Sequence, residues 1–531
     1  MAERVKKTKA VMEYGDFQTP IELARRLCSI LRSRAVYPQS IIEPTCGLGN
    51  FLFAAVDEFA PQYALGLELN SSYVDAVRAK ARSRGDSGLK VVQDSFFDAD
   101  WPSLVERMPD PLLVIGNPPW VTSSSLGVIG SGNTPGKSNF QGHSGYDAIS
   151  GKSNFDISEW MLIRIIEWFS NRTGAMAMLC KTAVARKVLH YAWKNHIRIS
   201  GASIHLVDAG EHFGAAVDAC FLVCHFGEGE AVQECPIYSD IYGGLADRLV
   251  GYRDRQLVSN VAAYDRTKAL GGSSCYKWRS GIKHDCAKVM ELVREGPLFR
   301  NALGQSVDVE TECVLPLLKS SDIARGRHES PRRWMLIPQR TVGDNTRLLA
   351  LTAPKTWKYL VEHAAALDGR RSSIYTKRPR FAIFGVGDYS FAPWKVAISA
   401  LYKTLTFRVI GPFEERPIVL DDTANFLACY TKEEAEYVAS LLCSDPAQEF
   451  LEARVFWDSK RPVTVDLLDR LDLHAVAREM GSEPLFARFA PGLSTRPHRR
   501  SEACGGLQLP MDIPTPAASQ KTDAAEYTLA G

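Results

Sequence analysis

The sequence lacks the long apolar runs that membrane-spanning helices require. Within its 531 residues no apolar stretch reaches about 18 residues, and the opening MAERVKKTKA lacks the apolar core of a signal peptide. The 12 cysteines are scattered and none belongs to a C-x-x-C pair, which argues for reduced thiols and against a zinc site. We therefore expect a cytoplasmic protein with no metal ion and no membrane contact.

Two nucleotide-binding fingerprints are also missing. The sequence has no G-x-x-x-x-G-K-[ST] run, which argues against a nucleoside triphosphate site. The G-x-G turn at Gly47 and Gly49 is followed by Leu52 where a dinucleotide fingerprint has its third glycine. A nucleotide-like ligand at this turn should therefore be neither a triphosphate nor a dinucleotide.

The overall charge is small, +2, but it is unevenly distributed along the chain. Residues 271–410 contain 23 Lys and Arg against 12 Asp and Glu, whereas residues 411–480 contain 7 against 15. This asymmetry favours a surface in the middle of the chain that faces a polyanion; chance clustering is the alternative.

The first half of the chain alternates strand-like and helix-like segments from residue 20 to about residue 225. Strands that alternate with helices of this length predict a mainly parallel sheet with helices on both faces, and we assign residues 1–265 to this α/β domain. Residues 121–155, rich in Gly, Ser and Asn, interrupt the pattern. They are typical of a mobile loop beside a site, and equally of a solvated insertion without a function.

The second half of the chain does not continue the regular alternation of strands and helices. Strand-like and helix-like segments are mixed between residues 266 and 482 without another glycine fingerprint, which predicts a separate α+β domain. Residues 483–531 are rich in Pro, Ser, Gly and Ala and read as a disordered tail.

Three successive strands of the α/β domain end in residues suited to an adenosine. Glycines in I-I-E-P-T-C-G-L-G-N-F-L (41–52) let the backbone approach a ligand closely. Glu68 ends the second strand, where a carboxylate can accept both ribose hydroxyls, and Asp94 ends the third, where it can accept from an adenine amine with Phe96 or Phe97 beside the ring. An acidic clamp without a phosphate cradle favours S-adenosylmethionine.

The fourth strand ends in V-I-G-N-P-P-W (114–120), a rigid turn at the place where open α/β sheets bind ligands. The side-chain oxygen of Asn117 and the carbonyl of Pro118 could accept the two hydrogens of an aromatic amine, making its nitrogen nucleophilic, and Pro119 adds rigidity. Trp120 offers a flat face on which an extruded base can stack. In the alternative interpretation the same residues have only a structural role, as a turn that ends the strand and a packed tryptophan.

This arrangement resembles the gamma-class N6-adenine DNA methyltransferases of restriction–modification systems, in which the cofactor motifs, (D/N/S)-P-P-(Y/F/W) and a target-recognition domain follow in this order. The resemblance implies a Rossmann-like class I S-adenosylmethionine-dependent methyltransferase fold with a C-terminal α+β target-recognition domain. It implies cofactor contacts by Thr19, Pro20, Glu43, Cys46, Gly47, Gly49, Glu68, Asp94, Phe96 and Asn117, catalysis by Asn117, Pro118, Pro119 and Trp120, stacking of the base on Trp120 and Phe213, and a place near the pocket for Asp156 and Ile157.

Such an enzyme acts on double-stranded DNA, and its cognate restriction endonuclease, where one exists, is expected to be a separate chain. Arg and Lys interleaved with aromatic residues suit phosphate contacts and base readout. An RNA-adenine or protein-glutamine N-methyltransferase is the alternative, because those enzymes share N-P-P-(Y/F/W). A DNA-binding subunit without activity is a third, although the intact N-P-P-W counts against it. The candidate DNA contacts are Lys319, Arg370, Arg371, Lys377, Arg378, Arg380, Trp394 and Lys395.

Overall fold

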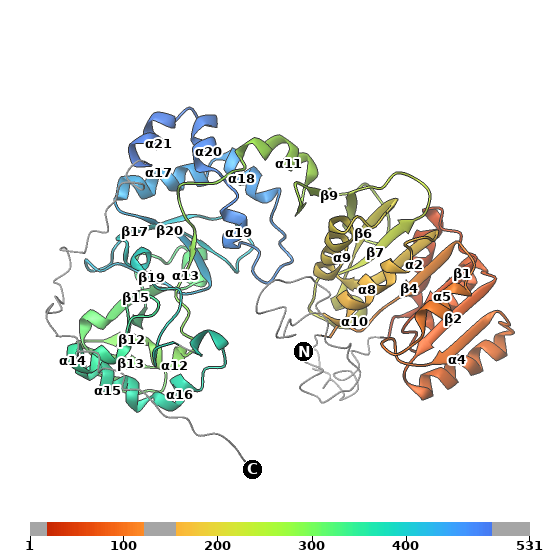
Figure 1. Cartoon of the computed structure of the whole chain (residues 1–531), viewed down its shortest axis with the longest axis horizontal. Coiled ribbons are helices and arrows are strands. Elements are labelled where there is room, and N and C mark those ends of the chain that lie inside the picture. Colours follow the sequence, from red (N-terminus) through yellow and green to blue (C-terminus); the bar gives the residue numbers. More distant parts are fainter. Residues whose placement is uncertain (1–17, 122–155, 377, 491–531) are drawn as a thin grey trace, which may run out of the picture.

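The computed structural model describes residues 18–121, 156–376 and 378–490, which form two lobes joined by a bridge (Figure 1). A ten-stranded sheet runs through the first lobe, with helices on its two faces. Its strands are β1 (Ser40–Glu43), β2 (Tyr63–Glu68), β3 (Leu89–Gln93), β4 (Leu112–Gly116), β5 (Gly174–Lys181), β6 (Gly201–Val207), β7 (Ala219–Phe226), β8 (Glu234–Tyr238), β9 (Arg248–Arg253) and β10 (Gln256–Val258). Its helices are α2 (Ile21–Ser33), α3 (Asn50–Phe59), α4 (Ser71–Arg84), α5 (Trp101–Glu106), α8 (Ile157–Glu167), α9 (Thr182–Lys194) and α10 (Ala209–Phe213), and α11 (Val261–Thr267) lies at the bridge (Figure 1).

The strand order is β10-β9-β8-β6-β7-β5-β4-β1-β2-β3. Strands β3, β2, β1, β4 and β5 are parallel, as the alternating sequence pattern predicts. The other half of the sheet departs from that prediction, because β7 runs antiparallel to both β5 and β6, and β8 to β10 extend the sheet beyond the last strand that the pattern indicates. The mainly parallel sheet is therefore correct only for the half that carries the candidate site.

Strand β4 shows why the sheet is covered on both faces. Its side chains alternate between two cores: Leu112 and Val114 pack with α5, α8 and α9, whereas Leu113 and Ile115 pack with α2, α3 and α4. All four residues are 0% exposed. A strand buried on both faces needs a continuous apolar run, and burial of this kind contributes roughly 1.5–3 kcal/mol for each large side chain.

The second lobe contains a four-stranded sheet, order β11-β20-β17-β18, and a six-stranded sheet, order β14-β13-β12-β16-β15-β19. Helices α17, α18, α20 and α21 lie on the four-stranded sheet's side of the lobe, and α14 to α16 lie near the six-stranded sheet (Figure 1). The strands are β11 (Arg279–Ser280), β12 (Glu291–Glu295), β13 (Leu298–Asn301), β14 (Ser306–Val307), β15 (Val314–Leu318), β16 (Arg333–Leu336), β17 (Trp394–Ser399), β18 (Arg408–Ile410), β19 (Val419–Leu420) and β20 (Ala424–Cys429). The helices are α12 (Ala287–Met290), α13 (Ser320–Ala324), α14 (Leu349–Thr352), α15 (Pro354–Glu362), α16 (Ala364–Asp368), α17 (Lys432–Leu442), α18 (Asp445–Glu452), α19 (Val465–Leu468), α20 (Leu473–Glu479) and α21 (Glu483–Phe489), with 3-10 turns at Lys268–Leu270, Thr311–Cys313, Thr346–Leu348, Ser373–Tyr375 and Asp388–Phe391.

Helix α21 corrects the expected start of the tail at residue 483. Its residue Phe486 is 5% exposed and packs against the rings of Tyr276 and His474, at centroid distances of 6.2 and 5.2 Å. The aromatic residues of this helix add it to the lobe, because Phe489 also packs against Tyr437, at a centroid distance of 5.7 Å. The described chain continues to residue 490.

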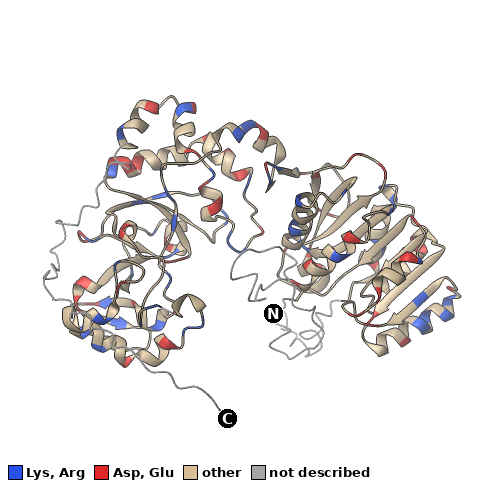
Figure 2. Cartoon of the chain, in the orientation of Figure 1, with Lys and Arg blue, Asp and Glu red and all other residues tan. Residues whose placement is uncertain are grey.

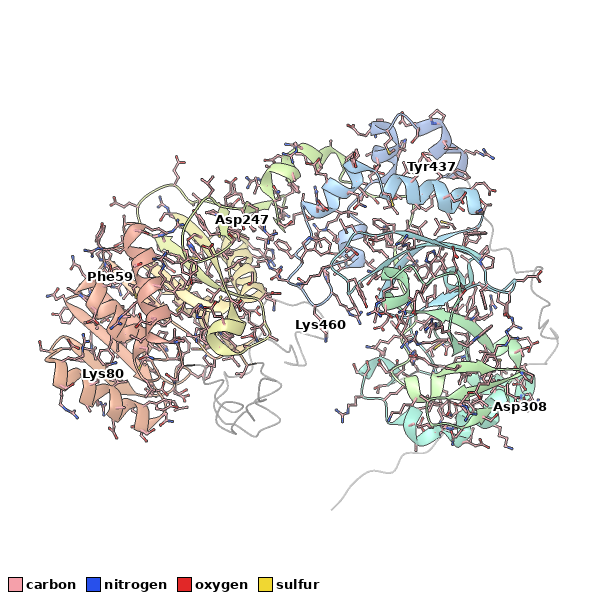
Figure 3. All side chains as sticks on the ribbon, turned by 180° about the vertical axis from the view of Figure 1, so that it is seen from behind. Phe59, Lys80, Asp247, Asp308, Tyr437 and Lys460 are labelled. Atoms are coloured by element: carbon pink, nitrogen blue, oxygen red, sulfur yellow. The ribbon has the colours of Figure 1, made fainter. Side chains whose placement is uncertain are left out.

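The two lobes are connected by specific contacts at the bridge. The Arg186 guanidinium of α9 lies 2.8 Å from Asp458 Oδ2 and stacks over Phe456 at 4.3 Å, and the backbone N–H of Ser259 donates to the carbonyl of Ala453. Lys460, two residues beyond Asp458, lies between the lobes when the molecule is viewed from behind (Figure 3).

Candidate active site

The carboxyl ends of β3, β2, β1 and β4 meet at one edge of the sheet and surround a cavity of about 450 Å³. This is the size range of small-molecule sites, and it lies where open α/β sheets bind ligands. The predicted residues that line it are Thr19, Glu43, Cys46, Gly47, Glu68, Asp94, Phe96, Asn117 and Pro119.

The glycine turn after β1 is held by a carboxylate from the next strand. Gly47 has φ +50°, and a Cβ there would come within 2.7 Å of the Gln18 side chain, so a side chain would crowd this wall of the cavity. The backbone N–H groups of Gly47 and Asn70 donate to the two oxygens of Glu68, each at 2.8 Å. Glu68 is thereby fixed at the cavity, with its remaining lone pairs available for ligand hydroxyls.

Glu43 is a second carboxylate of this edge, but it is almost fully buried at 3% exposed. One of its oxygens accepts from the N–H of Leu52, in the first turn of α3, at 2.8 Å. Burial raises the pKa of the Glu43 carboxyl well above its ordinary value, and the nearby charge of Glu68 adds to the effect. Burial likewise raises the pKa of the Cys46 thiol, so this cysteine is a neutral part of the wall and not a thiolate nucleophile.

Asp94 and two phenylalanines form the wall at the end of β3. The N–H of Ser95 donates to Asp94 Oδ1 at 2.8 Å, which orients the carboxylate. Phe96 is 6% exposed and packs against Trp101 at 5.1 Å, so most of its ring belongs to the core. Phe97 also lines the cavity and is half-buried, which makes it the better of the two predicted neighbours for a ligand ring.

Asn117 stands where β4 ends, at the rim of the same cavity. Its amide Nδ2 donates to Thr19 Oγ1 at 3.3 Å, and the carbonyl of Thr19 accepts from Asn50 Nδ2 at 2.8 Å. Because the amide nitrogen is held by Thr19, the side of the group that carries Oδ1 is also defined. Thr19 thus helps to orient the asparagine, in addition to lining the cavity.

The remainder of the N-P-P-W turn packs inward. Pro119 lines the cavity, whereas Pro118 is buried and is not one of the lining residues. Trp120 is 6% exposed, less open than a stacking face suggests, and its ring meets Phe213 edge-to-face at 5.3 Å. The structure therefore brings together the two aromatic residues that the sequence analysis paired, from positions 93 residues apart.

Two of the predicted cofactor contacts, Pro20 and Gly49, do not line the cavity. Pro20 is the N-cap residue of α2, and Gly49, with φ +76°, is the N-cap residue of α3. Three further residues line the cavity although none was among the predicted contacts: Gln18, Asn50 and Asn70. Gln18 and Asn50 are the neighbours of Thr19 and Gly49, so adjacency to the motifs was the signal that could have found them.

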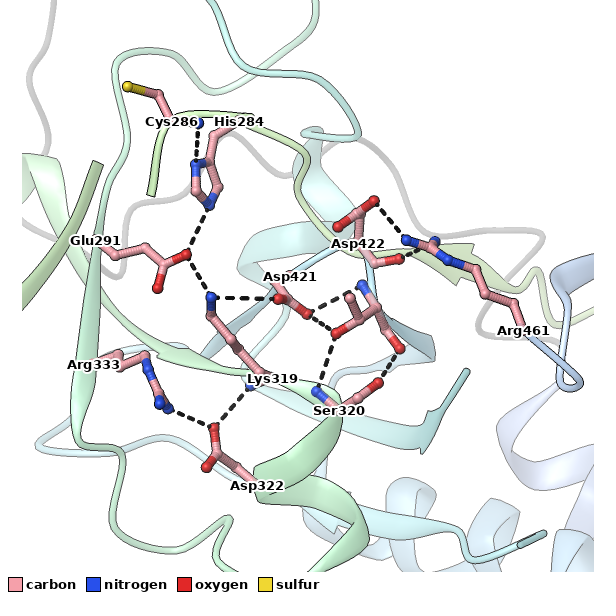
Figure 4. A network of polar contacts seen from close by, with 11 residues as sticks. His284, Cys286, Glu291, Lys319, Ser320, Asp322, Arg333, Asp421, Asp422 and Arg461 are labelled. Carbon is pink, nitrogen blue, oxygen red and sulfur yellow. Dashed lines mark hydrogen bonds and ion pairs between the residues drawn. The ribbon is translucent and has the colours of Figure 1, made fainter. Parts of the chain in front are cut away.

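Among the predicted DNA contacts, Lys319 lies inside a charged network of the second lobe (Figure 4). Its Nζ is 2.6 Å from Glu291 Oε1 and 3.9 Å from Asp421 Oδ2, and His284 Nε2 lies 3.2 Å from the same oxygen of Glu291. Although burial opposes it, the hydrogen bonds from His284 and Lys319 hold the pKa of Glu291 below its ordinary value. The ammonium is thus already shared between two carboxylates.

The arginine-rich stretch surrounds a second cavity, of about 610 Å³, in the same lobe. Arg370 donates to the carbonyls of Leu367 and Ala382, and burial lowers the pKa of its guanidinium. Arg380 forms an ion pair with Asp368 at 2.6 Å. Arg371 and Arg378 are exposed, and Lys377 lies outside the described residues. Figure 2 shows Lys and Arg interleaved with Asp and Glu along this lobe.

Lys395 corrects one of these predictions. It is 1% exposed in β17, between β20 and β18, and its ammonium donates to the carbonyl of Ala392 at 2.6 Å. Burial lowers the pKa of Lys395 to about 7. A side chain enclosed in this way does not reach DNA. Its neighbour Trp394 is half-buried and packs beside Gly411, so it is also largely a core residue.

The described residues contain neither a metal-binding group of side chains nor a membrane-spanning helix. No group of three or more His, Cys, Asp and Glu side chains in residues 18–121, 156–376 and 378–490 is placed to hold a metal ion. None of the helices in those same ranges is long and apolar enough to cross a membrane.

No protein-family model matches this chain. It is 44% identical over 480 residues to the type II methyltransferase M.NspV of Nostoc sp. (strain ATCC 29411 / PCC 7524), and the match covers 90% of this chain and 99% of the relative. The chain belongs to the type II methyltransferases of restriction–modification systems. This membership confirms the coarser part of the resemblance seen in the motifs of the sequence.

The fold of this type II methyltransferase is also found in a solved structure. The type IIL restriction–modification enzyme MmeI, solved in complex with DNA, matches with a TM-score of 0.51 at 12% identity, over 88% of this chain and 68% of that one. At this identity the likeness shows a common fold and no more.

Proposed function

We propose that this type II methyltransferase transfers the methyl group of S-adenosylmethionine to N6 of an adenine rotated out of double-stranded DNA, as a gamma-class enzyme. The observation that carries the proposal is the placement of Asn117 at the rim of a cofactor-sized cavity, with its amide held by Thr19. The family of M.NspV and the fold shared with MmeI, solved with DNA, support a DNA substrate.

The chemistry of the cavity fits S-adenosylmethionine. Among the described lining residues there is no Lys or Arg, whereas Glu68 and Asp94 are acidic. Such a wall suits a ligand that carries a sulfonium and an ammonium and disfavours one with phosphates. Glu68 would accept the ribose hydroxyls and Asp94 the adenine amine, with Phe97 and the edge of Phe96 beside the ring.

The catalytic residues act on the substrate amine. Bound S-adenosylmethionine supplies an electrophilic methyl group, so the protein has only to position N6 and raise its nucleophilicity. The Asn117 Oδ1 and the Pro118 carbonyl accept the two N6 hydrogens, which draws the nitrogen lone pair out of the ring. Pro118 and Pro119 keep these acceptors rigid, and one N6 proton passes to water after the transfer. Trp120 and Phe213 form the aromatic wall for the base.

The second lobe supplies the target-recognition surface in this proposal. Exposed Arg347, Arg371 and Arg378 can each contact a phosphate, and Arg347 and Arg378 share the wall of the 610 Å³ cavity. Lys460, between the lobes, adds a cation on the path from one lobe to the other (Figure 3). A cognate restriction endonuclease would be a separate chain, because the relative whose length this chain spans is itself a methyltransferase.

To test this proposal, the chain is expressed in a methylation-deficient host and N6-methyladenine in the host genome is mapped by single-molecule sequencing. The variant Asn117→Ala, expressed in the same way, is the control. Methyladenine in one short motif, absent with the variant, would establish both the reaction and the recognition site. A folded protein that binds S-adenosylmethionine but leaves genomic DNA unmarked would overturn the proposal in favour of an RNA adenine or a protein glutamine.

A further inference from the structure

Lys181 joins the catalytic turn to the helix that follows it. It is the last residue of β5, the strand beside β4, and lies at the same edge of the sheet as N-P-P-W. Its Nζ donates to the carbonyl of Trp120 at 3.1 Å and to Asp156 Oδ2 at 2.6 Å. Its side chain is 25% exposed and that of Asp156 is 9% exposed. Neither residue lines the cofactor cavity.

The turn needs a donor from elsewhere in the molecule. Pro118 and Pro119 have no backbone N–H, so neither residue can hold the turn by donating a bond, and β4 has already ended at Gly116. A bond to the Trp120 carbonyl fixes the peptide group two residues beyond the carbonyl of Pro118. Lysine suits this place because its ammonium has three donors and can serve two acceptors at once.

Asp156 gives this bond a rigid base. It is the N-cap residue of α8, where its Oδ1 accepts from the N–H and hydroxyl of Ser158 at 3.1 and 2.5 Å, leaving Oδ2 for Lys181. Beside it, the N–H of Ile157 donates to the carbonyl of Val121 at 2.9 Å. Helix, ion pair and turn are therefore tied together on both sides of the segment 122–155.

We propose that Lys181 is a positioning residue, which with Asp156 holds the Trp120 carbonyl and thereby keeps the Asn117 and Pro118 acceptors in register with the target amine. The inference rests on the proposed methyl transfer for its kinetic consequence. The carboxylate also neutralises the ammonium, so that no net cation faces the nitrogen that becomes positive as it is methylated. The sequence analysis gave Lys181 no role.

The decisive comparison is Lys181→Met against Lys187→Met. Lys187 also pairs with a carboxylate at the start of α8, Glu159, at 2.6 Å, but it does not contact the turn. We expect Lys181→Met to slow single-turnover methylation by about 30- to 100-fold, the cost of a small misplacement at a reacting centre. The dissociation constant of S-adenosylmethionine should stay within about twofold, since Lys181 lies outside its cavity. Lys187→Met should leave both values near wild type.

A second readout is independent of activity. Hydrogen–deuterium exchange of the peptide that covers residues 112–121 should quicken in Lys181→Met and not in Lys187→Met. Lys181→Arg can still donate to both acceptors, so it should restore slow exchange and most of the methylation rate. Unchanged exchange together with an unchanged rate in Lys181→Met would overturn the inference. A wild-type chain that methylates no DNA would instead overturn the proposed function, and the exchange result would still decide the role of Lys181.

Discussion

The sequence predicts contact residues both at the sheet edge of the first lobe and in the arginine-rich stretch of the second lobe. The structure places the side chains of these two regions differently. At the sheet edge, residues from positions 19 to 117 converge on one cavity. In residues 370–395, Arg370 turns inward, Arg380 pairs with Asp368 and Lys395 is enclosed. Parallel strands bring their carboxyl ends together whatever the side chains are, whereas no such rule directs a basic side chain outward. Motifs tied to strand ends therefore indicate which residues converge, whereas a charge-rich run does not indicate which of its side chains face solvent.

The largest effect that would test the first side of this comparison is expected from Asn117→Ala. Loss of the preorganised acceptor should lower the methylation rate by about 10²- to 10³-fold or more, while S-adenosylmethionine still binds. Single-turnover kinetics and calorimetric titration measure the two. Asn117→Asp is the matched control, because it keeps an acceptor oxygen and should retain far more activity. Equal rates in wild type and Asn117→Ala would remove this residue from the mechanism.

Glu68→Ala should have the next largest effect, on the cofactor and not on the chemistry. It removes the carboxylate that accepts from Gly47 and Asn70 and that would face the ribose, so the affinity for S-adenosylmethionine should fall about 10- to 100-fold. Calorimetry measures the loss, and the rate at saturating cofactor should be much less affected. Undiminished affinity would mean that the cofactor lies elsewhere.

The second side of the comparison is sharpened by Arg347→Glu with Arg378→Glu, two exposed residues of the arginine-lined cavity. If they contact phosphates, DNA affinity should fall by about tenfold or more. The slope of log affinity against log salt concentration should become shallower by about 1–2. Lys80→Glu with Arg82→Glu on α4 changes the net charge equally and is the control. Equal losses in both pairs would show that only overall charge matters.

The smallest effect concerns Lys395→Met, which should leave DNA binding unchanged and stabilise the protein by about 1–3 kcal/mol at pH 7, since a buried ammonium is removed. The folded-state pKa of Lys395 is about 7, below its ordinary value of 10.5. The unfolded chain therefore binds more protons between these values, and wild-type stability should rise as the pH increases from about 7 to 10.

Denaturant unfolding measures the free energy of unfolding across this pH range. The rise with pH that is due to Lys395 should be present in wild type and absent from Lys395→Met. Lys358→Met is the control, because the Lys358 side chain is 80% exposed. Its removal should change neither the free energy of unfolding nor the affinity for DNA. A weaker affinity for DNA in Lys395→Met, with a stability curve unchanged from wild type, would restore Lys395 to the DNA-binding surface.

Much of the fold was predictable from local signals. The alternation of strand-like and helix-like segments is present as β1 to β5 with their helices, and the apolar run before Asn117 is the fully buried β4. The antiparallel half of the sheet was not predictable, because a strand such as β7, buried along nearly its whole length, has the same apolar pattern in either direction. Helix α21 was missed because its short apolar segment was grouped with the Pro-, Ser-, Gly- and Ala-rich residues that follow it.

By itself the sequence determined the kind of site: a glycine turn, two strand-end carboxylates and N-P-P-W specify which chemical groups stand at one edge of a parallel sheet, because each motif acts through its own short backbone segment. The tertiary structure alone decided which groups meet across the chain. The bonds from Asn117 to Thr19 and from Lys181 to Trp120 and Asp156 join residues 98, 61 and 25 positions apart. Whether a lysine faces solvent or a core depends on neighbours from distant strands, and packing among them settled it for Lys395.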